Sequence, residues 1–514
     1  MNQTASKGHP KGLYVLFATE MWERFNYYGM RAILVLFMTK ALLFDKVFAS
    51  NLYGSYTSLV YLTPLLGGYI ADRYWGNRMS IIAGGLVMAI GEFILFFCGH
   101  LYESSPQLSS LLFFSGLGFM IAGNGFFKPN ISSLVGQLYP KGDRRIDAAY
   151  TIFYMGINVG GAIGPFVCGL VGDTGNPADF KWAFLAAGIG MLLSVVVQKL
   201  FHHKYVLNPQ GEVLGLVPDD APKIATKPLV VVGGLILMSL LMIGLLYIDA
   251  KVVNYLTYLL LAAVLFIAFL IFSDKTLNGT EKQRIGVIFI VAFFVIFFWS
   301  AFEQAGASLT FFAEEQTKRD LGFFVVPASF FQSLNSLFVV AFAPLFAWLW
   351  IKLGKKEPAS PTKMAMGLLL LAIGYLWIAF GVKDVQPGIK VSMIWLTGMY
   401  MLHTWGELCL SPIGLSLVNK LAPFKFASLL MAVWFLANAA ANKLAGVLSA
   451  LYPEAGKTTS FLGYKMHNMH EFFMLFVFMA GIASLLLFLL TKKLQYMMHQ
   501  DKYSSHFLQA IVYK

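Results

Sequence analysis

Long apolar runs alternate with short polar segments along the whole chain. A helix needs about 20 mostly apolar residues to cross a bilayer. Runs of about that length or longer lie at 13–43, 50–71, 79–99, 108–138, 147–172, 180–200, 229–248, 252–273, 284–312, 328–351, 363–382, 391–419, 423–450 and 470–492. Backbone polar groups in lipid must be satisfied within the segment, so we expect helices. The pattern predicts an all-α integral membrane protein with fourteen spans.

The spacing of these runs divides the chain into groups of six, two and six. A polar stretch after the sixth run holds Pro209, Pro218 and Pro222, which is typical of a segment outside the membrane. We therefore expect an N-terminal six-helix bundle at 1–200, a cytoplasmic linker at 201–228, two accessory transmembrane helices at 229–273, a C-terminal six-helix bundle at 274–495 and a cytoplasmic tail at 496–514.

Composition and charge support a membrane protein and exclude several other classes. Apolar residues make up 58% of the chain and charged residues 12%, whereas soluble domains have about 45–50% and about 25%. A disordered chain, a coiled coil and an ordinary soluble enzyme are therefore excluded. The net charge of +12 needs no nucleic-acid partner, because most Lys and Arg residues fall on one side when the N-terminus is cytoplasmic. This bias predicts that both termini are cytoplasmic.

Charged residues inside the apolar runs are the first candidates for function. Each costs about 2.5–3.5 kcal/mol at the bilayer centre on insertion scales, so such residues mark functional sites by default. Five acidic and four basic residues could pair around an aqueous cavity, although static ion pairs between helices remain an alternative. The nine residues are Glu20, Glu23, Arg24, Arg31, Glu92, Lys128, Glu303, Glu407 and Lys443.

The first run carries a polar stripe at helical spacing. Its members recur three or four residues apart, which places them on one face of a helix. An interfacial helix is excluded, because the apolar run 32–38 follows directly. We therefore expect the stripe to line an aqueous path. It consists of Glu20, Glu23, Arg24, Tyr27, Tyr28 and Arg31.

Several motifs resemble those of the proton-dependent oligopeptide transporter family within the major facilitator superfamily. They are TEMWERFNYYGMRAIL at 19–34, NGFFKPNISSLVGQLYP at 124–140, FYMGINVGGAIGP at 153–165, FFWSAFEQAGASL around Glu303 and WGELCLSPIGLSLV around Glu407. The loop GYIADRYWGNR at 68–78 resembles a superfamily signature. The resemblance implies two six-helix bundles, the two added helices of bacterial members, and a place in the plasma (bacterial inner) membrane.

The resemblance also implies a substrate and the residues that bind it. Family members couple proton entry to uptake of di- and tripeptides by alternating access. Arg24, Arg31 and Lys128 can bind the peptide carboxylate through charge-assisted hydrogen bonds. The resemblance assigns the peptide ammonium to Glu407, with help from Asn158 and Asn335. Aromatic residues with polar tips would line the rest of the pocket, namely Tyr27, Tyr28, Tyr61, Tyr154 and Trp434.

Proton coupling needs a carboxylate whose partners change during transport. By resemblance, Arg31 with Glu303 and Lys128 with Glu407 form gating salt bridges between the two halves. The proton-coupling residues we expect are Glu20, Glu23, Arg24 and Glu303. The residues do not decide which of these carboxylates carries the proton.

Other functions remain as alternatives. A related proton-coupled importer could carry another small anion or zwitterion, for example nitrate. A drug exporter is disfavoured by the matched carboxylate and ammonium sites. The sequence contains no GxSxG or Walker A motif, so catalysis and ATP drive have no support. We expect no catalytic residue, no metal site, no cofactor beyond the coupling proton, and a monomer.

Overall fold

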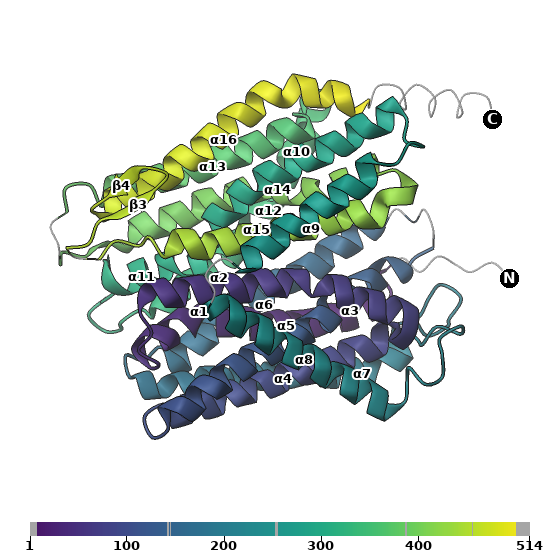
Figure 1. Ribbon diagram of the computed structural model, residues 1–514, viewed down its shortest axis with the longest axis horizontal. Coiled ribbons are helices and arrows are strands. Elements are labelled where there is room, and N and C mark those ends of the chain that lie inside the picture. The colour runs from purple at the N-terminus through teal and green to yellow at the C-terminus, as the bar shows by residue number, and fades with distance from the viewer. Residues whose placement is uncertain are drawn as a thin grey trace. The chain divides into compact units, whose positions relative to one another are not determined.

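The computed structural model describes residues 8–140, 143, 145–251, 255–385, 388–454 and 456–499 (Figure 1). The expected all-α class is confirmed. The first eight helices are α1 Lys11–Lys40, α2 Lys46–Leu62, α3 Pro64–Ile70, α4 Gly76–Leu101, α5 Pro106–Gln137, α6 Ile146–Gly172, α7 Phe180–Tyr205 and α8 Pro228–Lys251. They are followed by α9 Tyr255–Phe272, α10 Gly279–Phe302, α11 Ser308–Glu315, α12 Ser333–Leu353, α13 Ser360–Gly381, α14 Met393–Leu421, α15 Ala427–Ser449 and α16 Met469–Met498.

Short strands occur only between helices in the described part of the chain. Strand β1 (Thr317–Lys318) pairs in parallel with β2 (Val391–Ser392), and β3 (Thr459–Phe461) pairs antiparallel with β4 (Tyr464–Met466).

Eleven helical segments in the described residues are long and apolar enough to cross a membrane. One of them, Lys46–Leu101, covers two predicted runs, because α2, α3 and α4 follow one another through a π-helical turn at Ala71–Trp75. The charged helix α1 and the helix α14 cover two further runs. The structure is therefore consistent with fourteen spans.

The predicted run 284–312 differs from a continuous helix. It breaks into α10, a 3₁₀ turn at Glu303–Gly306, and α11. A β-carbon at Gly306 would meet the hydroxyl oxygen of Tyr53, so a larger residue there would force the Tyr53 side chain to move. A 3₁₀ turn within a helical run is a frequent mark of a hinge.

Two compact units make up the chain. Unit 1 contains Met1–Val253, Ala305–Glu315 and Arg319–Val340, and unit 2 contains Asn254–Gln304, Gln316–Lys318 and Ala341–Lys514. The accessory pair is divided between them, since α8 packs on α5 and α2 while α9 packs on α15. The predicted domain boundaries stay a prediction, and most of the predicted tail, from residue 500 on, lies outside the described residues.

Small residues set the packing of unit 1. Helix α1 lies against α6 and α7. Gly156, Gly160 and Gly164 recur every four residues on α6, and each faces a main-chain oxygen of α1. A β-carbon at Gly160 would lie 2.2 Å from the Met21 carbonyl oxygen. Such small-residue spacing lets membrane helices approach closely, and here it brings α6 against the polar stripe of α1.

A buried aromatic cluster organises unit 2. Tyr375 on α13 is fully buried, stacks on Phe476 of α16 with ring centroids 4.7 Å apart, and donates its hydroxyl to the Ala301 carbonyl oxygen at 2.6 Å. The hydroxyl is thereby satisfied inside an apolar core, which a buried polar group requires.

Candidate transport site

Arg24 lies between two carboxylates on one turn of α1. Its Nε is 3.1 Å from Glu20 Oε1, and it also forms an ion pair with Glu23. All three side chains are buried. The spacing predicted from the sequence thus produces a compact charged cluster, in which two carboxylates share one guanidinium. A buried ion cluster of this kind persists only when its charges are paired and hydrogen-bonded.

Asn124 on α5 completes this cluster and was not singled out from the sequence. Its Nδ2 donates to Glu23 Oε1 at 3.2 Å. Asn124 precedes Lys128 by one helical turn, so the spacing to that predicted site residue was the available signal. Helix α5 therefore supplies a neutral donor to a carboxylate of α1.

The tyrosines of the stripe lie under its cations. The Arg24 guanidinium carbon is 5.3 Å from the ring centroid of Tyr27 and 5.9 Å from that of Tyr28. The guanidinium carbon of Arg31 is 5.5 Å from the Tyr28 ring centroid. Because these are cation–π distances, the predicted stripe is one connected set of side chains along α1.

Lys128 and Tyr61 are also brought together. The Lys128 Nζ lies 4.4 Å from the ring centroid of Tyr61 on α2. Nearby, the Thr63 hydroxyl donates to the Ile121 carbonyl oxygen at 3.1 Å, which ties the end of α2 to α5. A predicted carboxylate-binding cation and a predicted pocket tyrosine therefore share one place in unit 1.

The remaining predicted residues of unit 1 lie on α6 and α12. Asn158 is buried, and its Nδ2 donates to the Tyr154 carbonyl oxygen one turn earlier at 2.9 Å. Asn335 is half-buried near the start of α12. This start is fixed to α6, because the Ser333 hydroxyl donates to the Ala162 carbonyl oxygen at 2.8 Å.

Three predicted residues belong to unit 2. Glu303 begins the 3₁₀ turn after α10, Glu407 lies on α14, and Trp434 lies on α15, and all three are buried. The gating pairs Arg31–Glu303 and Lys128–Glu407 would each join a residue of unit 1 to one of unit 2. Both pairs stay a prediction.

A second buried polar connection in unit 1 involves Glu92, to which the sequence assigned no role. Asn26 on α1 donates through Nδ2 to Glu92 Oε1 on α4 at 2.9 Å and to the Ala187 carbonyl oxygen on α7 at 3.0 Å. Asn26 thus ties three helices together behind the stripe. Asn26 stands between the stripe residues Glu23 and Tyr27 in sequence but lies off the polar face of α1. Helical spacing therefore did not single it out.

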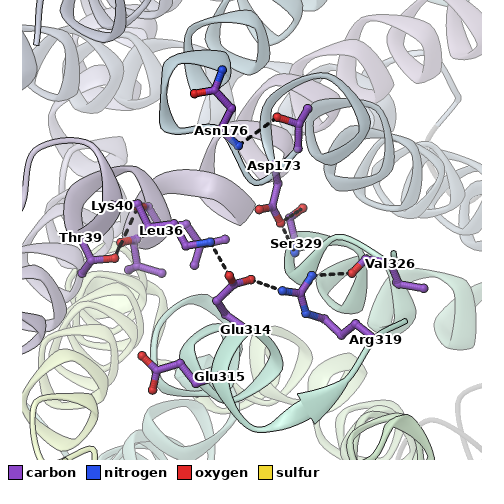
Figure 2. A network of polar contacts seen from close by, with 12 residues as sticks. Leu36, Thr39, Lys40, Asp173, Asn176, Glu314, Glu315, Arg319, Val326 and Ser329 are labelled. Atoms are coloured by element: carbon purple, nitrogen blue, oxygen red, sulfur yellow. Dashed lines mark hydrogen bonds and ion pairs between the residues drawn. The ribbon is translucent and has the colours of Figure 1, made fainter. Parts of the chain in front are cut away.

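Where α1 ends, a polar network connects the parts of unit 1 at Ala305–Glu315 and Arg319–Val340 to the rest of that unit (Figure 2). Glu314 of α11 forms ion pairs with both Lys40 and Arg319. Arg319 also donates through Nη1 to the Val326 carbonyl oxygen at 2.6 Å. In the same region, Asp173 follows α6 and accepts hydrogen bonds from Ser329. These two parts follow α10 in sequence, yet their polar partners include residues of α1 and α6.

Known proteins resemble the chain over most of its length. Uncharacterized transporter YclF of Bacillus subtilis is 37% identical over 465 residues, which cover 88% of this chain and 90% of YclF. A di-/tripeptide transporter of Lactococcus lactis is 32% identical over 469 residues, covering 87% and 90% of the two chains. The crystal structure of a POT family transporter in complex with 5-aminolevulinic acid aligns with a TM-score of 0.80 at 31% identity, over 96% of this chain and 99% of that one.

These likenesses confirm the two-bundle major facilitator fold expected from the sequence, since the aligned structure covers nearly the whole chain. The POT family model matches residues 78–468, which is well over half of the chain. The chain is therefore a multi-pass membrane transporter that belongs to the POT family.

Proposed function

We propose that this transporter imports di- and tripeptides together with protons by alternating access. The observation that carries the proposal is the cluster in which Arg24 pairs with Glu20 and Glu23 while Asn124 donates to Glu23. Two carboxylates lie beside Arg24 in this cluster, which supports a role for them in proton exchange and for Arg24 in carboxylate binding. The name of the Lactococcus lactis relative, a di-/tripeptide transporter, supports the substrate class.

Peptide recognition uses fixed groups for the two charged ends of a zwitterion. Arg24, Arg31 and Lys128 bind the carboxylate end, since charge-assisted hydrogen bonds are the strongest available here. The ammonium end is bound by Glu407, with Asn158 and Asn335 beside it. Variable side chains contact a tolerant aromatic lining made of Tyr27, Tyr28, Tyr61, Tyr154 and Trp434.

Proton coupling follows from competition between the peptide carboxylate and the glutamate carboxylates for the same cations. A peptide carboxylate that binds Arg24 competes with Glu20 and Glu23, so a carboxylate released from its ion pair takes up a proton more readily. Glu303 couples in the same way through Arg31. Loss of the Arg31–Glu303 and Lys128–Glu407 pairs then permits the change between outward-open and inward-open states.

The orientation of the protein in the membrane follows from the charge bias of the sequence. The protein lies in the bacterial inner membrane with both termini in the cytoplasm, because Lys and Arg are enriched in the loops on that side. It works as a monomer with protons as the coupling ion.

Uptake by purified protein in liposomes tests the proposal. Labelled dialanine under an inward proton gradient should accumulate above equilibrium, and a protonophore should abolish this accumulation. Glu303→Gln should lose accumulation and keep peptide counterflow. Glu103→Gln, which changes an exposed loop carboxylate, is the matched control and should behave as the wild type. Equilibration without accumulation would contradict proton coupling.

A second candidate is import of another small zwitterion or anion. It is favoured by the solved relative that holds 5-aminolevulinic acid, a zwitterion without a peptide bond. Competition decides between the two. If labelled 5-aminolevulinic acid or labelled nitrate is taken up and unlabelled dipeptides do not compete with it, the peptide proposal is wrong.

A further inference from the structure

Asn26 of α1 and Glu92 of α4 form a buried pair of side chains in unit 1. Both residues are 0% exposed. The Asn26 Nδ2 donates to Glu92 Oε1 at 2.9 Å and to the Ala187 carbonyl oxygen at 3.0 Å. Because both of these partners are acceptors, they fix the orientation of the Asn26 amide, with its nitrogen toward them and its oxygen away.

Each residue of the pair keeps one oxygen atom that is not hydrogen-bonded. Within the described residues, Glu92 Oε2 and Asn26 Oδ1 are buried and have no hydrogen-bond partner. Buried polar atoms are almost always paired, so two unpaired atoms on side chains that already contact each other call for a common explanation. Both oxygens are acceptors while Glu92 is ionised. A proton on Oε2 makes that atom a donor, and Oδ1 is then an acceptor for it.

The surroundings of Glu92 do not compensate a negative charge. In the described part of the chain, Glu92 forms no ion pair. Helix α7 presents a glycine to it, since a β-carbon at Gly188 would lie 3.1 Å from Glu92 Cβ. Tyr56 of α2 and Cys168 of α6, on two helices that pack against α1, are buried and carry no charge at pH 7 with their ordinary pKa values. A buried carboxylate with one neutral donor is much less favourable than the neutral acid.

We propose that Glu92 is a proton-binding site that stays occupied at neutral pH, and that its carboxylic acid and the Asn26 amide form a closed pair. The amide Nδ2–H donates to Oε1, as the structure has it, and the acid Oε2–H donates to Oδ1. The second amide N–H reaches Ala187, so the neutral pair joins α1, α4 and α7 without a charge in the core.

This proton is distinct from those that the proposed coupling mechanism exchanges. Glu23 and Arg24 pair with each other on the polar face of α1, and Asn26 lies off that face. The inference is therefore independent of the proposed transport function, and its tests read the proton and the stability of the protein rather than uptake.

Infrared spectroscopy of the purified full-length protein at pH 7 detects the proton, because a protonated carboxyl group has a carbonyl stretch that ionised carboxylates lack. We expect Glu92→Gln to lose the band of one protonated carboxyl group. Glu103→Gln, at an exposed loop carboxylate, is the control and should lose none, since an exposed glutamate is ionised at this pH. A Glu92→Gln spectrum with no lost band would overturn the proposal, because Glu92 would then be ionised and need donors such as bound water.

Asn26→Leu tests the closed pair. The Glu92 acid loses its partner in this variant, so its carbonyl band should stay and move to higher frequency, as expected for a less hydrogen-bonded acid. A band at the wild-type frequency would show that the acid does not pair with Asn26 and would overturn the closed pair.

The pH dependence of unfolding gives a second measurement. Glutamine places an N–H where the protonated glutamate has its O–H, so Glu92→Gln can form the same pair. An unfolded glutamate releases its proton near pH 4.3, whereas the folded wild type keeps it, so the stabilisation by this proton is lost as the pH rises. From about pH 5 to about pH 7, the unfolding equilibrium constant of the wild type should rise about tenfold per pH unit relative to that of Glu92→Gln. A constant ratio over this range would overturn the proposal.

Discussion

The Asp173 carboxylate accepts two hydrogen bonds from Ser329 through the same oxygen. The backbone N–H and the hydroxyl of Ser329 both lie 3.2 Å from Asp173 Oδ2. Asp173 comes directly after α6, whereas Ser329 lies in the 3₁₀ turn before α12. One carboxylate therefore connects two segments that are 156 residues apart in sequence (Figure 2).

Burial of the Asp173 carboxyl predicts a pH-dependent stability. Burial raises the pKa of the Asp173 carboxyl above its usual value, although the Ser329 hydrogen bond opposes this. The folded state therefore binds the proton more tightly than the unfolded state, and this stabilisation is lost as the pH rises through the raised pKa. We expect the thermal midpoint of the wild type to decrease as the pH is raised from about 4 to about 7. The midpoint of Asp173→Asn should decrease less over the same range.

Asp384→Asn, at an exposed loop carboxylate, is the control and should follow the wild-type curve. Parallel curves for Asp173→Asn and the wild type would remove Asp173 as the source of the pH dependence.

The shared ion pairs of Glu314 should make a small, salt-sensitive contribution. The Lys40 and Glu314 side chains are 27% and 21% exposed, so we expect a coupling free energy of about 0.5–1 kcal/mol. A double-mutant cycle with Lys40→Met and Glu314→Gln measures it. The coupling should shrink at about 1 M salt, where the screening length is about 3 Å. The exposed pair Glu454–Lys457 provides a reference cycle, and equal coupling in both cycles would contradict this prediction.

The close approach of α1 and α6 predicts a steric cost at Gly160. A methyl group there meets the Met21 carbonyl oxygen, so Gly160→Ala should lower the free energy of unfolding by roughly 1–3 kcal/mol. Gly244→Ala on α8 is the matched control, because a β-carbon there has no atom within 4 Å. Denaturation in mixed micelles measures both variants. If they unfold alike, the glycine spacing on α6 does not set this packing.

The Asn124 contact predicts a change in the pH profile of transport. Asn124→Ala removes a donor to Glu23, and a hydrogen bond to a charged group is worth about 1.5–3 kcal/mol. Because Glu23 then lacks this donor, the pH profile of proton-driven uptake should change. Asn51→Ala removes an amide that donates to the Val47 carbonyl oxygen within α2, and it should leave the profile in place. An unchanged profile in Asn124→Ala would assign Asn124 to packing alone.

The candidate site was predictable wherever its residues share one helix. Glu20, Glu23 and Arg24 follow helical spacing, so a periodicity argument places them together, and the structure does so. Asn124 and Asn26 escaped the same argument, because their partners lie on other helices. Helical periodicity says which residues share a face and nothing about which face of another helix meets it.

Apolar run length determined the membrane class and the approximate helix positions, because a bilayer imposes one length and one hydrogen-bonding solution on every span. Helical spacing within the first run determined the polar stripe. Tertiary structure alone decided where the run 284–312 breaks, which unit each accessory helix joins, and that Ser329 meets Asp173. These features depend on close contacts between distant segments, such as the one Gly306 permits beside Tyr53. Such contacts are set by the shapes of both partners, and no local pattern in either segment records them.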